Sequence, residues 1–126
     1  MDNQKIILLT HEYPPKRGGA GVYCEELVNA SQKLGFSIEA WVPQYAKENK
    51  HTRTIKNEGS QSWFCSYRIF KELWKRRKSF STPTVLHFAE PGSLRAMLRF
   101  GWMIKKLPSY MITIHGTELI RFCKNP

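Results

Sequence analysis

The predicted fold of this chain is decided by KIILLTHEYPPKRGGAGVYCEELVNASQKLGFSIEAWVP, residues 5–43. It opens with KIILLT, residues 5–10, a continuous apolar run typical of a strand buried on both faces of a parallel sheet. Apolar residues at helical spacing follow, and Gly35 stands where that helix is expected to stop. The next segment, SIEAWVP (residues 37–43), is predicted to be a second strand that ends at its proline. Strand, helix and strand in this order predict a βαβ unit.

The residues of this unit that face the core can be predicted from periodicity. On the helix, the residues expected to face the sheet are Tyr23, Leu27, Ala30 and Leu34, with Val28 alongside. On the second strand, alternation directs toward the core Ile38, Ala40 and Val42. The helix and the two strands are therefore expected to share one core.

The rest of the chain continues the alternation of strands and helices. Residues 44–62 are polar and basic, and they are predicted to form a long loop with a short strand near residues 54–55. Further predicted elements are a helix at 66–80, a strand at 84–88, a helix from Pro91 through Trp102, and a strand at 110–116. This order predicts an α/β fold with a doubly wound, mostly parallel sheet and helices on both faces. A length of 126 residues fits a single domain at residues 1–126.

Composition narrows the class of protein. The chain is 41% hydrophobic and 13% aromatic, which is enough to form a core and too much for a disordered segment. Its formal net charge of +10 favours an anionic partner: a nucleotide, a nucleic acid or an acidic lipid surface. The three cysteines are widely spaced, which indicates reduced thiols, and no signal peptide or membrane-spanning run is recognised. We therefore expect a cytoplasmic protein that is at most peripheral on the inner face of the membrane.

Polar side chains follow the predicted strands at the ends where a ligand would bind. In an open parallel sheet, ligands bind beyond the carboxyl ends of the strands. The histidines expected at those ends are His11, His87 and His115, each with an acid nearby in the sequence: Glu12, Glu90 and Glu118. This pattern favours a substrate crevice, with the capping of loops by strand-end histidines as the alternative. Three histidines would be enough ligands for a metal site, but nothing in the sequence fixes their geometry. No metal is therefore expected.

A glycine cluster precedes the first predicted helix. Gly18, Gly19 and Gly21 would let an anion such as phosphate approach the free amides of the helix N-terminus. The dinucleotide pattern GxGxxG fails, because Cys24 holds its third glycine position, seven residues separate Thr10 from Gly18, and no acid follows the second strand. A Walker loop fails as well, because no GKS or GKT occurs. An ordinary structural turn stays the alternative.

Three separated blocks of the sequence resemble one enzyme family. They are THEYPPKRGGAGVYCEELVNASQKLGFSIEAWVP, VLHFAEPGSLRAML and MITIHGTEL, which together span nearly the whole chain. In this order they resemble the N-terminal, acceptor-side domain of GT-B retaining glycosyltransferases of the large group called family 4. The resemblance implies a Rossmann-like domain that takes part in transferring a sugar from a nucleotide-sugar donor to a glycan or lipid-linked acceptor.

The resemblance also implies roles for particular residues. The catalytic residues would be His115 and Glu90, and backbone groups of Gly18 and Gly19 would lie near the donor diphosphate, with Gly116 leaving room beside the donor sugar. The acceptor pocket would be bordered by His11, Glu12 and Tyr13. The nucleotide-sugar is a co-substrate, and no cofactor or metal is implied.

This chain departs from the family in length. A complete GT-B enzyme has a second Rossmann-like domain with the nucleotide pocket, and no acidic pair after MITIHGTEL matches that domain's Glu-x7-Glu motif. We therefore expect a partial N-terminal domain that is inactive alone and works with a partner chain or domain supplying the C-terminal half. A non-catalytic fragment that pairs with a partner chain is a further alternative.

The segment RIFKELWKRRK, residues 68–78, carries six basic residues and one acid. A basic amphipathic helix is typical of contact with an anionic membrane surface, and the candidate residues are Arg68, Lys71, Lys75, Arg76 and Lys78. A core-packed helix with a solvated basic face is the alternative. A non-catalytic basic module that binds nucleic acid or an anionic membrane is the competing function. No nucleic acid is expected as partner, because no RNP, KH or helix-turn-helix signature occurs.

Overall fold

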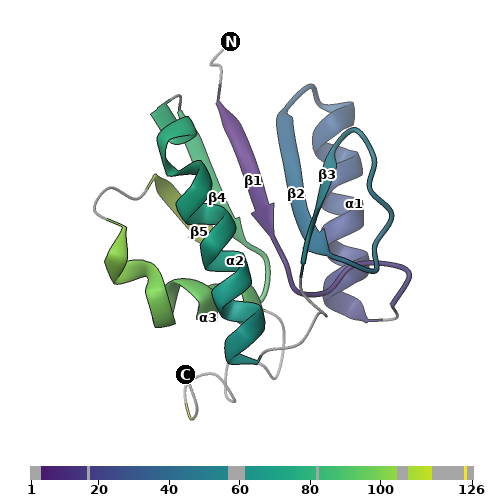
Figure 1. The fold of residues 1–126 in the computed structure, drawn as a ribbon. Coiled ribbons are helices and arrows are strands. Elements are labelled where there is room, and N and C mark those ends of the chain that lie inside the picture. Colours follow the sequence, from purple (N-terminus) through teal and green to yellow (C-terminus); the bar gives the residue numbers. More distant parts are fainter. Residues whose placement is uncertain are drawn as a thin grey trace.

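A computed structural model describes residues 4–16, 18–56, 62–81, 83–104, 108–114 and 124 of the chain. These residues form a five-stranded sheet in which every paired strand is parallel (Figure 1). The strands are β1 (Lys5–Leu9), β2 (Ser37–Pro43), β3 (Thr52–Ile55), β4 (Thr84–Phe88) and β5 (Ser109–Ile112), in the order β3-β2-β1-β4-β5. The predicted α/β, Rossmann-like fold is confirmed.

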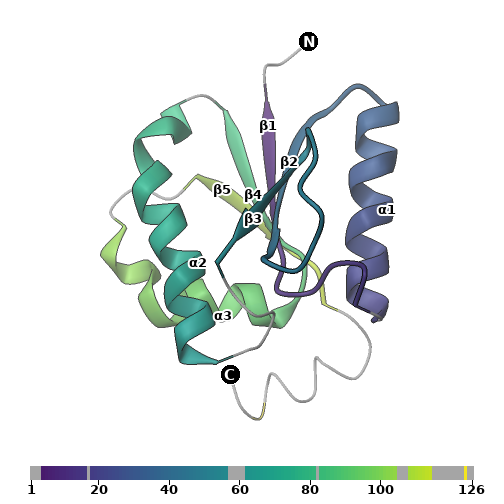
Figure 2. The same ribbon diagram turned by 45° about the vertical axis from the view of Figure 1, so that its right-hand side comes forward.

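Helices cover both faces of this sheet (Figure 2). Helix α1 (Gly19–Lys33) lies on one face, and α2 (Trp63–Arg76) and α3 (Pro91–Phe100) lie on the other. Two short 3₁₀ helices, η1 (Arg77–Ser81) and η2 (Gly101–Met103), continue α2 and α3. The doubly wound arrangement is therefore confirmed as well.

Two hydrophobic cores result, one on each face of the sheet. Ile7 and Leu9 of β1 pack in the core under α2 and α3, whereas Leu8 between them packs in the core under α1. All three side chains are at most 3% exposed. A central parallel strand needs apolar residues at consecutive positions for this reason, which explains the uninterrupted run in the sequence.

The predicted core face of α1 is confirmed at Val28, which is buried, and in part at Tyr23 and Leu27, which pack half-buried against the same core, but it is wrong at Ala30 and Leu34. The buried residues are Ala20, Gly21, Cys24, Val28 and Ser31, whereas Ala30 and Leu34 are exposed and Tyr23 and Leu27 are only half-buried. The buried stripe consists mostly of small side chains, which let the helix lie close to the sheet and to the preceding loop. A pattern based on large apolar residues therefore selects the neighbouring face.

The predicted alternation along β2 is incomplete. Ile38, Ala40 and Val42 do enter the core under α1, as predicted. Trp41, on the opposite face, is 1% exposed and belongs to the core under α2 and α3. Its indole Nε1 donates a hydrogen bond to Glu39 Oε1 at 2.7 Å, which satisfies its polar atom at the core boundary. Strand β2 is therefore buried on both faces.

The predicted end of α1 is confirmed in detail. Gly35 has a φ of +82°, a conformation that favours glycine, just after the C-cap residue Leu34. Gly35 N–H donates to Gln32 O at 3.0 Å, and Phe36 N–H donates to Ser31 O at 2.9 Å. These two bonds form a Schellman motif, which satisfies carbonyls that a helix end would otherwise leave unpaired.

Candidate functional site at the carboxyl edge of the sheet

Strands β1 and β4 are neighbours in the sheet, and the strands that follow each of them in the chain are added on opposite sides of this pair. From β1 the chain proceeds to β2 and β3 on one side, and β4 and β5 lie on the other side. Leu9 pairs with Phe88 at the ends of these two strands, so His11 and Glu90 each lie two residues beyond a paired position. In open α/β sheets, the carboxyl ends at such a switch point are where ligands bind.

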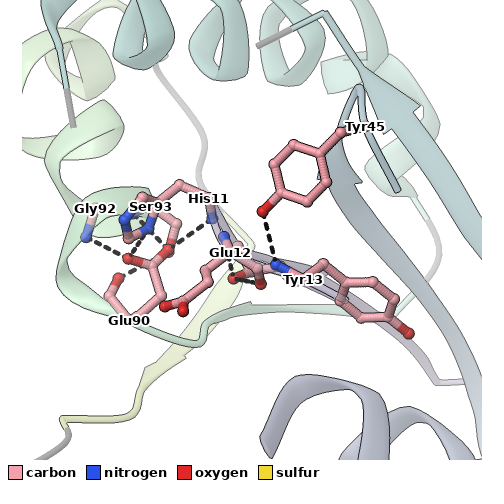
Figure 3. Close-up of polar contacts among 8 residues, drawn as sticks. His11, Glu12, Tyr13, Tyr45, Glu90, Gly92 and Ser93 are labelled. Carbon is pink, nitrogen blue, oxygen red and sulfur yellow. Dashed lines mark hydrogen bonds and ion pairs between the residues drawn. The ribbon is translucent and has the colours of Figure 1, made fainter. Parts of the chain in front are cut away.

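Glu90 is a fully buried acidic side chain at this edge, with 0% exposure. Its Oε1 accepts from the backbone N–H of His11 and of Ser93, both at 2.9 Å, and its Oε2 accepts from Gly92 N–H at 2.6 Å (Figure 3). Oε2 also forms an ion pair with His11 Nδ1. Glu90 is therefore the N-cap of α3 and, at the same time, the anchor of the loop after β1.

The ionisation of Glu90 follows from these contacts. Burial alone raises the pKa of the Glu90 carboxyl, but the hydrogen bond and positive charge of His11, together with the backbone donors, outweigh burial. The pKa of Glu90 is consequently lower than that of an ordinary glutamate. An ionised carboxylate here is surrounded by donors from within the chain.

The His11 ring lies over the first turn of α3. A β-carbon at Gly92 would clash with the Nδ1–Cε1 edge of this ring and with Glu90 Oε2, so the His11–Glu90 pair occupies the space that a side chain at position 92 would need. The His11 side chain is 12% exposed, whereas Glu90 beneath it is fully buried. His11 is thus the member of the pair that reaches the surface.

Residues 10–13 of the β1–α1 loop are held by hydrogen bonds within the loop and to Tyr45. Thr10 Oγ1 donates to Glu12 O at 2.7 Å and accepts from Glu12 N–H at 3.1 Å. Tyr13 N–H donates to Tyr45 Oη at 3.2 Å, and Lys16 Nζ lies 4.9 Å from the centre of the Tyr45 ring. Tyr13 itself is 6% exposed and belongs to the core under α1. Residues 10–13 are therefore held in place along this edge of the sheet.

The loop after β1 fills the space beside two glycines of the cluster. A β-carbon at Gly18, the N-cap of α1, would overlap the Glu12 carboxylate. One at Gly21 would lie 3.2 Å from Tyr13 Cα, whereas one at Gly19 meets nothing within 4 Å. Gly18 and Gly21 therefore give room to Glu12 and Tyr13 of the chain itself. Of the two glycines predicted to bind a diphosphate, only Gly19 has open space beside it.

A second polar group lies at the end of β5. His87 Nε2 and Thr113 Oγ1 are 2.7 Å apart, and the same Thr113 oxygen is 3.4 Å from Tyr23 Oη on α1. Thr113 N–H also donates to Phe88 O at 3.0 Å. The carboxyl end of β5 is thus tied to β4 and to α1.

The basic segment of α2 lines a groove beside β3. Two adjoining cavities of about 550 and 350 Å³ lie there and share Glu72 and Lys75 in their walls. Four of the five membrane-surface candidates line these cavities: Arg68, Lys71, Lys75 and Arg76. Lys78 lies beyond the helix in η1 and is exposed.

A membrane-binding helix inserts its apolar side chains into the lipid. In α2 these side chains are buried in the core instead. Ile69, Phe70 and Leu73 are at most 4% exposed. Four aromatic residues of α2 stay at the surface: Trp63, Phe64 and Tyr67 in the first turns, with 53, 68 and 42% exposure, and Trp74 near the other end, with 37%. We call Trp63, Phe64 and Tyr67 the aromatic patch. Phe64 and Tyr67 of this patch line the 350 Å³ cavity together with Arg68 and Lys71.

A third cavity lies away from the switch point. It has a volume of about 450 Å³ and is lined by apolar residues of β4, β5, α3 and η2. In the described part of the chain, the cavities around α2 and β5 do not include His11 or Glu90 in their walls.

The structure brings together most of the residues predicted to form the site. His11, Glu12, Tyr13, Gly18, Gly19 and Glu90 all belong to the carboxyl edge around β1 and β4. His115 and Gly116 lie outside the described residues. The catalytic, donor-binding and acceptor-binding roles of all these residues stay predictions.

Sequence reasoning missed several residues of this edge: Gly92, Ser93, Tyr45 and Thr113. Gly92 and Ser93 had a usable signal, because Pro91 after an acidic residue is typical of a helix start whose first turn needs a cap. Tyr45 and Thr113 had none, since their partners are more than 20 residues away in the chain.

Comparison with known proteins does not assign this chain to a family. No protein-family model matches the chain, and a search of curated proteins finds no match. Within the described ranges, no helix has the length and apolar character needed to cross a bilayer. Among the same residues, no group of three or more histidine, cysteine, aspartate or glutamate side chains could hold a metal ion.

Proposed function

We propose that this chain is the acceptor-side domain of a GT-B-type glycosyltransferase, which transfers a sugar from a nucleotide-sugar donor to a glycan or lipid-linked acceptor. The observation that carries the proposal is the meeting of His11 and Glu12, after β1, with Glu90, after β4, at the switch point of an all-parallel sheet. This is the position at which α/β enzymes bind their substrates. The three sequence blocks that resemble the family support the same assignment.

In this proposal, some residues of the edge contact the acceptor and others contact the donor. His11 and Glu12, which are half-buried, hydrogen-bond acceptor hydroxyls, and Tyr13 shapes the pocket wall from within the core. The amide of Gly19 approaches the donor diphosphate, and His115 and Gly116 border the donor sugar. A partner domain or chain supplies the nucleotide pocket, and no metal takes part.

The proposal is tested by nuclear magnetic resonance on the full chain. UDP-glucose, GDP-mannose and the matching methyl glycosides are added at millimolar concentration to the ¹⁵N-labelled protein. We expect amide shifts to concentrate at residues 10–19 and 89–93, and His11→Ala to abolish them. His51→Ala, in the loop before β3, is the matched control that keeps them. The proposal fails if no probe shifts this edge, or if His11→Ala leaves the shifts unchanged.

A further test needs an active transferase that contains this chain. There, His115→Ala is expected to lower turnover by about tenfold or more with the fold intact, as loss of a group that stabilises developing charge does. Unchanged turnover would remove His115 from the donor site.

A second candidate function, contact with an anionic membrane surface, is favoured by the aromatic patch. Trp63 and Tyr67 stack with ring centroids 5.7 Å apart, and cationic side chains follow directly along the same flank of α2. Aromatic residues settle at the level of lipid headgroups, and each nearby cation adds about 1 kcal/mol of attraction to anionic lipid. Such a contact would bring a lipid-linked acceptor to the domain.

Vesicle co-sedimentation tests this contact. We expect binding to phosphatidylglycerol vesicles, no binding to phosphatidylcholine vesicles, and weaker binding as salt rises. Lys71→Gln with Lys75→Gln removes two charges and should weaken binding by roughly 30-fold. Lys33→Gln with Lys50→Gln removes two exposed charges elsewhere and is the matched control. Equal loss in both variants, or preference for a polynucleotide over the vesicles, would contradict membrane contact.

A further inference from the structure

The larger cavity beside α2 has a charged wall. It has a volume of about 550 Å³ and is bounded by β3, the last turns of α2 and η1, with these lining residues: Arg53, Thr54, Glu72, Lys75, Arg76 and Ser79. Three cations and one acid leave a formal charge of +2 on the described wall. The adjoining cavity of about 350 Å³ adds three more cations, Lys56, Arg68 and Lys71. The charge of the two cavities therefore complements an anion.

Arg53 is positioned in this wall by the neighbouring strand. Its Nε donates to Glu39 Oε1 at 3.2 Å, and the same oxygen accepts from Trp41 Nε1 at 2.7 Å. Burial raises the pKa of the Glu39 carboxyl, but Trp41, Lys5 and Arg53 together outweigh burial and lower that pKa. Glu39 is thus an ionised anchor for Arg53. The bond to Glu39 uses one of the five N–H donors of a guanidinium group.

Arg76 lies in the same wall without a hydrogen bond from its Nε. This nitrogen is buried, and no acceptor among the described residues is in hydrogen-bonding range of it. Glu72 Oε2 lies 3.6 Å from Arg76 Nε, and Glu72 Oε1 lies 3.7 Å from Lys75 Nζ, whereas a charge-assisted hydrogen bond is about 2.7–2.9 Å long. The Arg76 side chain is 36% exposed and can be reached from solvent. Glu72 therefore offsets part of the positive charge and leaves hydrogen-bond donors for a ligand.

The position of Lys75 and Arg76 at the end of a helix does not account for the whole wall. Both lie in the last turn of α2, where cations complement the partial negative charge of the helix end. Arg53 has no such role, because it comes from β3 and lines the same cavity. Cations that converge on one cavity from separate elements are typical of a binding site.

We propose that this cavity binds a phosphate group, with the guanidinium groups of Arg53 and Arg76 donating to its oxygens and Lys75 adding a point charge. A phosphate monoester carries a charge of about −1.5 to −2 near neutral pH, which matches the +2 of the wall. The planar fork of arginine suits phosphate oxygens. The hydroxyl groups of Thr54 and Ser79 already donate within the chain, to Glu48 Oε2 at 2.8 Å and to Arg76 O at 2.7 Å, so the cations supply the donors.

The inference deepens the second proposed function, contact with an anionic membrane surface, and rests on it. Lys75 belongs to the walls of both cavities, and the smaller cavity is also lined by Phe64 and Tyr67 of the aromatic patch. A lipid whose headgroup phosphate enters the larger cavity would therefore lie close to aromatic side chains at the level of the headgroups. A soluble phosphate ester offers the same chemistry, so the experiment has one arm for each source.

The first arm uses the full chain and two kinds of vesicle. Phosphatidic acid exposes a phosphate monoester, whereas the phosphate of phosphatidylglycerol is a diester covered by glycerol. Both lipids are diluted with phosphatidylcholine to the same zeta potential, so that the diffuse attraction is equal. We expect phosphatidic acid vesicles to bind roughly tenfold more tightly, because the monoester offers more charge and more oxygens to the two arginines. Equal binding of both vesicles contradicts a lipid phosphate in the cavity.

Arg53→Lys with Arg76→Lys tests the two arginines, because it keeps every charge and removes both guanidinium forks. We expect the preference for phosphatidic acid to fall to less than about twofold in this variant. Arg77→Lys, in η1 and outside the described wall, is the matched control and should keep the preference. Circular dichroism verifies that both variants are folded. Retention of the preference in the double variant, or its loss in Arg77→Lys, contradicts the roles of Arg53 and Arg76.

The second arm needs neither vesicles nor a variant. Glycerol 3-phosphate is added to the ¹⁵N-labelled full chain, with sodium chloride at equal ionic strength as the reference. Amide shifts at residues 53–54 and 72–79 with the ester alone assign the site to a soluble phosphate, and a vesicle preference without them assigns it to a lipid headgroup. The proposal is overturned if neither occurs, even where vesicle binding persists. Shifts without any vesicle binding would refute membrane contact and leave the phosphate site standing.

Discussion

Glu90→Gln is the substitution that most directly tests how this edge is held together. The glutamine side chain has nearly the same shape as glutamate, so packing at this fully buried position is preserved. One of its two oxygens, however, becomes an NH₂ group. Because each oxygen of Glu90 accepts from two donors, this NH₂ group must face donors on one side.

The expected loss of stability can be worked out from these contacts. At least one buried backbone N–H loses its acceptor, which costs about 1–3 kcal/mol. Removing one partner of a buried ion pair costs about 3–5 kcal/mol when the other stays charged, and less when it can neutralise, as His11 can by losing a proton. We therefore expect a loss of about 2–4 kcal/mol, a large share of a typical stability of about 5–15 kcal/mol. The melting temperature should fall by roughly 8–15 °C.

Urea denaturation and thermal unfolding at neutral pH measure this loss. Glu26→Gln, at an exposed position of α1, is the matched control and should change stability by less than about 0.5 kcal/mol. The reasoning is refuted if Glu90→Gln costs no more than Glu26→Gln, because Glu90 would then not be an ionised anchor.

The pH dependence of stability gives an independent measurement of the same side chain. The pKa of Glu90 is lower in the folded chain than in the unfolded chain. Its contribution is therefore fully present above the ordinary glutamate pKa of about 4.3 and is lost as pH falls through the folded value. Below about pH 4, the unaltered chain should lose stability more steeply than Glu90→Gln does.

Three other predictions concern the glycines and the core under α1. Gly19→Ala should raise the free energy of unfolding by about 0.5 kcal/mol. Gly21→Ala should lower it by about 1–3 kcal/mol, because its β-carbon would lie 3.2 Å from the backbone of Tyr13. Urea denaturation measures both, and equal effects would contradict this prediction. Burial raises the pKa of the Cys24 thiol to about 12, so at about pH 8 iodoacetamide should label Cys24 only after unfolding, as mass spectrometry of native and unfolded protein would show. Burial also raises the pKa of Tyr13 to about 12, so ultraviolet titration of the folded chain and of Tyr13→Phe should coincide up to about pH 11.

The order of strands and helices could be predicted because each element carries its own period. The run at residues 5–9 and the helical spacing of residues 19–33 are local signals, and Gly35 ends the helix by a local conformational rule. The phase of α1 could not be predicted in the same way. Its buried face contains Gly21 and Ser31, which have no hydrophobic signal, and Gly21 is buried where the backbone of Tyr13 approaches it closely.

The site was predictable as a region and not as a set of bonds. Parallel strands bring their carboxyl ends to one edge, so His11 and Glu90 could be expected near each other. Their contact depends on the register that pairs Leu9 with Phe88, because a shift by one residue would move one side chain away from the other. That register is set by packing on both faces of the sheet, which no local pattern in the sequence records.

The glycine cluster shows how one sequence signal can serve two physical purposes. Glycines before a helix allow close approach, and the sequence cannot tell whether a ligand or the chain itself approaches. Here the Glu12 carboxylate lies against Gly18, and the Tyr13 backbone lies against Gly21. An anion arriving beside Gly18 would therefore meet a negative charge already present, whereas the space beside Gly19 is open. This favours an uncharged hydroxyl ligand over a phosphate beside Gly18 and leaves the amide of Gly19 as the approach for the donor diphosphate, with the nucleotide pocket itself on a partner.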